Sequence, residues 1–87
     1  MAVVLVSFAE PIVSDGVTYT AEAWGAPMDG NLWEGWIAFT PRGGGVRIRS
    51  PRETTQPNYV DTEYWATGLT LVYLEGALTR ALEAREA

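Results

Sequence analysis

Residues 17–40, VTYTAEAWGAPMDGNLWEGWIAFT, decide the fold of this chain. The first eight residues alternate apolar and polar side chains, and the last nine are rich in aromatic residues, both typical of β-strands. Between them, Asp29-Gly30 is a strong hairpin signal, because glycine readily adopts the positive φ that a tight turn requires. The stretch therefore predicts a β-hairpin with strands over residues 17–24 and 32–40.

Shorter strands are expected on either side of this hairpin. Residues 2–9 (AVVLVSFA) and 46–49 (VRIR) are rich in the residues that favour strands. Turn signals at residues 14–16 (SDG) and 43–45 (GGG) separate them from the hairpin. Since short turns join antiparallel neighbours, we expect an antiparallel sheet of three to four strands.

The pattern becomes helical after Asn58, a residue that favours helix starts. Gly68 either ends one helix, with Thr70 capping a second, or lies inside one long helix at a cost of about 1 kcal/mol. Apolar side chains recur at helical spacing along one stripe: Val60, Tyr64, Leu71, Leu74, Leu78 and Leu82. The fold class is therefore α+β, an antiparallel sheet followed by a C-terminal helical segment packed on one face, in a single domain over residues 1–87.

Both faces of the predicted hairpin are apolar, although a half-solvated antiparallel sheet normally has a polar face. With Asp29-Gly30 as the turn, one face carries Thr18, Thr20, Glu22, Trp24, Trp33, Ile37 and Phe39. The other face carries Val17, Tyr19, Ala21, Ala23, Leu32, Glu34, Trp36 and Ala38. The small alanines favour this second face as the one under the helix, but the opposite assignment is nearly as good. The remaining face is then covered by the first strand and residues 50–57, by self-association, or by a small-molecule or peptide ligand.

The composition excludes several chemistries. The 87 residues include no cysteine, histidine or lysine, and eleven acids against six arginines give a net charge of −5. Disulfides, Cys/His zinc sites, thiol nucleophiles, lysine Schiff bases and histidine acid–base catalysis are therefore absent. We predict no catalytic residues, no metal ligands and no cofactor, and the sequence favours a non-catalytic protein over an enzyme. The apolar start lacks a basic residue and no apolar run approaches membrane length, so we expect a cytoplasmic protein with no membrane partner.

Four arginines, Arg42, Arg47, Arg49 and Arg52, form a basic cluster in this acidic chain. With the nearby tryptophans and tyrosines, such a cluster can grip phosphates or stack on bases. The alternative is that these arginines pair with acids on neighbouring strands.

A second candidate is the polar loop between Pro51 and Pro57. It contains Arg52, Glu53, Thr54, Thr55 and Gln56, and loops often carry function. The alternative is a structural connection from the sheet to the helix, predicted as a turn followed by extended chain.

Three segments, residues 33–37 (WEGWI), 51–58 (PRETTQPN) and 63–69 (EYWATGL), resemble a family of small bacterial proteins of unassigned function. The last of them continues as VYLEGAL over residues 72–78. That resemblance implies no activity, cofactor or catalytic residue. The order of elements is also similar to small β-β-β-α modules, such as antitoxins of the HicB type and double-stranded-RNA-binding-like folds, but element order alone does not specify function.

These observations lead to one main hypothesis, a non-catalytic protein-interaction module that forms a homodimer or binds another protein through an aromatic sheet face. We expect that face to centre on Trp24, Trp33 and Phe39, with Arg47 and Arg49 at its rim, because aromatic residues and arginine dominate binding hot spots. The alternative is a nucleic-acid-linked regulator that uses the cluster from Arg42 to Arg52.

Overall fold

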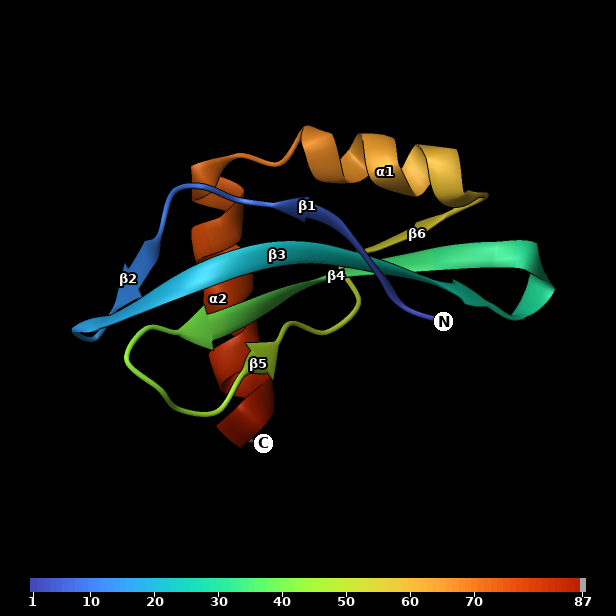
Figure 1. Cartoon of the computed structure of the whole chain (residues 1–87). Coiled ribbons are helices and arrows are strands. Elements are labelled where there is room, and N and C mark those ends of the chain that lie inside the picture. Colours follow the sequence, from blue (N-terminus) through green and yellow to red (C-terminus); the bar gives the residue numbers. More distant parts are fainter. Residues whose placement is uncertain (87) are drawn as a thin grey trace.

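A computed structural model, which describes residues 1–86, consists of one antiparallel sheet with two helices packed against it (Figure 1). The α+β class and the C-terminal helical segment are confirmed, and the sheet has six strands rather than three or four. The strands are β1 (Val3–Ser7), β2 (Ile12–Ser14), β3 (Val17–Met28), β4 (Leu32–Pro41), β5 (Ile48–Arg49) and β6 (Thr54–Gln56). The helices are α1 (Tyr59–Thr67) and α2 (Leu71–Glu86), and a 3₁₀ turn, η1 (Asp29–Asn31), joins β3 to β4.

The long β3–β4 hairpin forms the centre of the sheet. The strand order is β1-β3-β4-β5, with β2 beside β3 and β6 beside β4. The additional strands arise because the segments before and after the hairpin each form two short strands instead of one. Pro11 separates β1 from β2, and β6 pairs with β4 within the segment predicted as extended chain. All strand pairs are antiparallel.

The hairpin register differs from the one predicted, because the loop has three residues instead of two. Gly30 and Asn31 both have positive φ, of 78° and 61°, and Met28 pairs with Leu32. A shift of one residue moves every side chain of a strand to the opposite face. The predicted grouping of β4 was therefore wrong: Trp33, Ile37 and Phe39 lie on the face that the helices cover, and Trp36 lies on the other face.

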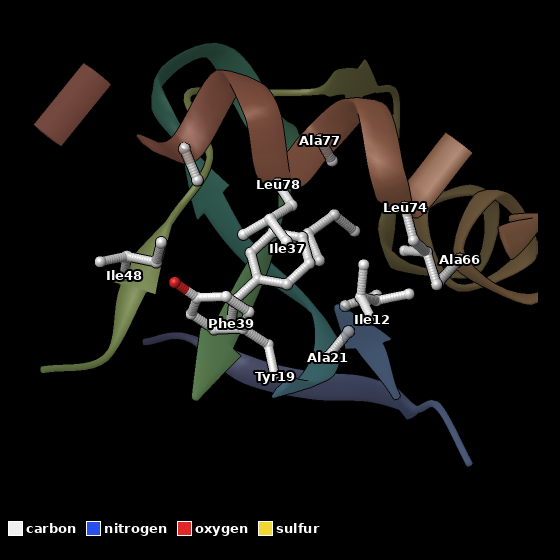
Figure 2. Close-up of a cluster of buried hydrophobic side chains, with 12 residues drawn as sticks. Ile12, Tyr19, Ala21, Ile37, Phe39, Ile48, Ala66, Leu74, Ala77 and Leu78 are labelled. Atoms are coloured by element: carbon white, nitrogen blue, oxygen red, sulfur yellow. The ribbon is translucent and has the colours of Figure 1, made fainter. Parts of the chain in front are cut away.

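The core lies between this hairpin and α2. Figure 2 shows the buried side chains of α2, among them Leu74 and Leu78, pointing toward those of the strands. Phe39 has no exposed surface and meets the Tyr19 ring edge-on, with centroids 6.4 Å apart. The sheet contributes small residues to this core, including Ala21.

Gly68 ends α1 and a second helix follows, which was one of the two alternatives. The Asn58 side chain accepts a hydrogen bond from the Asp61 backbone N–H at 2.8 Å and starts α1. The Thr70 hydroxyl accepts one from the Tyr73 N–H at 3.2 Å and starts α2.

The predicted apolar stripe was wrong for α1 and for Leu71 at the start of α2, which is 42% exposed. Val60 and Tyr64 point to solvent, and Thr62 and Ala66 are buried in their place. The reason is a close approach between α1 and two strand glycines. A Cβ on Gly35 would lie 2.6 Å from the ring of Trp65, and one on Gly25 would lie 3.2 Å from Thr62. The two glycines therefore allow α1 to lie close to the sheet, with Thr62 and Trp65 facing the strands.

Candidate functional site

The face of the sheet opposite the helices carries the candidate site. In Figure 1, α2 lies behind the strands and the viewer looks onto this open face. The register places Glu22 and Trp24 of β3 here, beside Trp36 and Ala38 of β4. No helix covers these positions in the part of the chain that the structure describes. Over the described residues, this side of the sheet therefore has no helical layer.

Two tryptophans stack at the centre of the open face. Trp24 and Trp36 are directly opposite across β3 and β4, with ring centroids 6.4 Å apart and planes inclined by 12°. The indole N–H of Trp24 donates to the Glu22 carboxylate at 3.2 Å. The cross-strand pair and this hydrogen bond fix the orientation of both rings.

Two arginines lie over the tryptophan rings. The Arg49 guanidinium is 3.9 Å from the Trp36 ring centroid, and that of Arg47 is 4.7 Å from the Trp24 ring centroid. Contacts of this kind contribute about 0.5–2 kcal/mol, depending on exposure. Arg47 also pairs with Glu22 at 3.3 Å. Trp36 is only 6% exposed although no helix covers it, because Arg49 lies across its ring.

These side chains surround an open pocket of about 280 Å³. Its apolar walls and its arginines come from β3, β4, the β5 region and the N-terminus: Ala2, Trp24, Trp36, Ala38, Arg47, Ile48 and Arg49. The pocket offers an apolar surface large enough for one aromatic side chain, with guanidinium groups beside it.

The charges of the open face are only partly paired. Arg47 pairs with Glu22, and Arg52 lies 3.7 Å from Glu34. Within residues 1–86, Arg49 makes no ion pair. The face thus carries three arginines against two carboxylates, a net charge of +1, and Arg49 is its unpaired cation.

The structure brings together only part of the predicted interaction face. Trp24, Arg47 and Arg49 lie together on the open side. Phe39 is a core residue with 0% exposure, and this prediction was wrong. Trp33 also lies on the helix side, where its ring packs edge-on against Tyr59 with centroids 5.2 Å apart. Both errors follow from the one-residue difference in hairpin register.

Trp36 is the residue that the sequence analysis missed. Its place on the open face depends on the three-residue turn, and the signal was present in Asp29-Gly30-Asn31, since asparagine tolerates the left-handed conformation better than most residues. A turn that includes Asn31 pairs Trp24 with Trp36 directly.

Most arginines of the predicted basic cluster make contacts within the fold. Arg42 lies in the turn after β4, where its N–H donates to the Thr18 carbonyl at 2.8 Å. Arg47 and Arg52 each pair with an acid of the sheet, as the alternative interpretation of the cluster expected.

The candidate loop has structural contacts in this fold. Thr54, Thr55 and Gln56 form β6 and pair with β4. The amide of Gln56 donates to the Thr54 hydroxyl at 2.7 Å, and Arg52 donates to the Thr55 hydroxyl at 3.3 Å. This segment closes the edge of the sheet and leads the chain to α1.

Glu53 joins this segment to α2. Its carboxylate is 4% exposed and accepts hydrogen bonds from the Tyr73 hydroxyl at 2.6 Å and from two Arg80 nitrogens at 2.7 and 3.1 Å. Burial alone would raise the pKa of Glu53, but hydrogen bonds from Arg80 and Tyr73 outweigh it and hold the pKa below its ordinary value. Burial and the Glu53 carboxylate raise the pKa of Tyr73 to about 12. This group is a buried structural link, because its polar atoms are used within the protein.

The described residues contain no group of three acidic side chains arranged to hold a metal ion. None of the helices over residues 1–86 is both long and apolar enough to cross a membrane. No protein-family model, curated protein or solved structure matches this chain.

Proposed function

We propose that this chain is a non-catalytic protein-interaction module that self-associates through the open face of its sheet. The observation that carries the proposal is the stacked Trp24–Trp36 pair under two arginines, on a face that no helix covers. Tryptophan and arginine are the residues most enriched in binding hot spots, and they act best when water is excluded around them. Docking of a partner would bury the part of Trp24 that is now exposed.

The size of the molecule supports a stable contact. Its extents are 40 × 28 × 20 Å, so its broad side has an area comparable with the roughly 800 Å² that each partner buries in a standard interface.

The charge supports a second copy as the partner. The open face carries +1 and the whole chain −5, so the remainder carries −6. A second copy therefore offers an acidic surface to the basic face. We place the protein in a bacterial cytoplasm.

Molar mass in solution tests this proposal. Light scattering behind a sizing column, over a hundredfold concentration range, should show a mass that rises with concentration. Arg49→Ala should reduce the association, because it removes the unpaired guanidinium over Trp36. Arg42→Ala is the matched control, since Arg42 is exposed, lies in the turn after β4 and does not line the pocket. A strict monomer at all concentrations would refute self-association.

A nucleic-acid-linked regulator is the second candidate function. The Arg49 guanidinium stacked on Trp36 is the kind of contact that single-stranded nucleic acids use. The small net charge of the face argues against it, because phosphate binding depends on a strong positive field. Fluorescence anisotropy with a labelled oligonucleotide at low salt decides this question, and absence of binding there ends it.

A further inference from the structure

We propose that the surface of the second copy that docks on the open face is the outer side of α1, so that the contact is head-to-tail. This inference rests on the proposed function and adds the identity of the partner surface. It starts from an apolar stripe that the fold leaves exposed. Val60 and Tyr64 are 68% and 80% exposed. They lie four residues apart and so share one side of the helix.

Acidic residues flank this stripe on both sides. Asp61 and Glu63 are exposed, and within residues 1–86 neither of them pairs with an arginine. The carboxylate of Glu63 accepts only a 3.3 Å hydrogen bond from Tyr59, and that of Asp61 a 3.4 Å bond from Asn58. The outer side of α1 is thus an aromatic and aliphatic stripe with a charge of −2.

The two surfaces are complementary in charge. The open face offers an unpaired cation, Arg49, beside an apolar pocket of about 280 Å³. Tyr64 provides an aromatic ring that fits such a pocket, and Glu63, its neighbour in the chain, provides a carboxylate for Arg49. Binding hot spots commonly combine aromatic rings with charge-assisted hydrogen bonds.

The contact forms between molecules because the two surfaces lie on opposite sides of the sheet. Thr62 and Trp65 of α1 approach Gly25 and Gly35 on the helix side, and the outer side of α1 points away from the sheet. Figure 1 shows α1 at the border of the molecule, apart from β5. One copy therefore presents α1 to the pocket of the next, and such a heterologous contact produces chains or rings.

A face-to-face dimer is the competing arrangement. It would bring the three arginines of one open face toward the three arginines of the other. Each face has only two carboxylates to compensate this charge, and both carboxylates already form ion pairs within their own chain. The α1 surface instead brings carboxylates to the unpaired arginine. Electrostatic complementarity of this kind selects between arrangements.

Two charge reversals separate the arrangements. Arg49→Glu destroys the open face and keeps α1, whereas Glu63→Arg alters α1 and keeps the open face. In analytical ultracentrifugation, each variant alone should associate at least about tenfold more weakly than the wild type. An equimolar mixture should associate again, because the open face of Glu63→Arg and the α1 surface of Arg49→Glu are unaltered and the two reversed charges attract each other at the other contact. Glu75→Arg, the same charge change on an exposed position of α2, is the control and should associate like the wild type.

The outcomes distinguish this inference from the proposed function. If Arg49→Glu prevents association while Glu63→Arg associates like the wild type, the open face is the interface but α1 is not its partner, and this inference is overturned. If the wild type itself stays monomeric, the proposed function fails and this inference fails with it. Tyr64→Ala tests the apolar part separately. It should also weaken association, and far-UV circular dichroism should show an unchanged fold, because the side chain is exposed.

Discussion

Removal of the Glu53 carboxylate should destabilise this protein by about 1.5–4 kcal/mol. The buried carboxylate accepts a 2.6 Å hydrogen bond from Tyr73, and charged hydrogen bonds of this kind contribute about 1.5–3 kcal/mol. The pair with Arg80 adds less, because the Arg80 side chain is 44% exposed and water can replace its partner, so we assign it about 1 kcal/mol or less. In Glu53→Ala both contributions are lost. In Glu53→Gln the amide oxygen still accepts from Tyr73, but the charge and the acceptor of the Arg80 Nε–H are lost, so the cost should be about 1–2 kcal/mol.

Urea denaturation followed by tryptophan fluorescence measures these differences, since four tryptophans report on the fold. The double variant Glu53→Ala/Tyr73→Phe is the control that tests whether the stability comes from the hydrogen bond between these two residues. If Tyr73 acts through Glu53, the losses of stability in the two single variants should not add in the double variant. A loss below about 0.5 kcal/mol in Glu53→Ala, an ordinary value for a surface substitution, would refute the assignment of Glu53 as a structural link.

Three further outcomes are expected. The pKa of Glu53 lies below its ordinary value of 4.5, so the ionised carboxylate stabilises the fold fully above pH 4.5. This stabilisation is lost as the pH falls through the lowered pKa. The free energy of unfolding should therefore decrease more steeply with falling pH in the wild type than in Glu53→Gln. Gly35→Ala should cost about 1–3 kcal/mol in urea denaturation, because its Cβ would meet the Trp65 ring at 2.6 Å, whereas Gly68→Ala meets nothing closer than 3.8 Å and should cost less. Trp33→Ala should lower the thermal midpoint and leave the molar mass unchanged, since Trp33 packs on Tyr59; a change in assembly with unchanged stability would contradict its placement.

Much of the architecture could be predicted from the sequence because its signals are local. Strand propensity and the Asp29-Gly30 pair identify the central hairpin, and Asn58 marks a helix start that the structure confirms. The fold class follows from these elements alone. The additional strands β2 and β6 were missed because each is short and adjoins a proline, Pro11 or Pro57, which indicates a break in a strand.

The site depends on features that local patterns do not contain. One additional residue in the hairpin loop exchanges the faces of β4, which puts Phe39 in the core and Trp36 on the open side. The hydrogen bonds of Glu53 join residues 20 and 27 positions apart, so no sequence window shows them. The orientation of α1 depends on its contact with Gly35, which is a property of the assembled fold.

The three-residue turn between β3 and β4 also has a consequence for the folding rate. Ten residue pairs extend from this turn, so the hairpin forms with very little loop-closure entropy and can form within microseconds. The link from Glu53 to Arg80 closes a much longer segment and should form later. Substitutions in the turn should therefore mainly slow folding, whereas those at Glu53 should mainly accelerate unfolding. The time for which the native state persists would then depend on α2 and Glu53, and the speed with which it is reached would depend on η1.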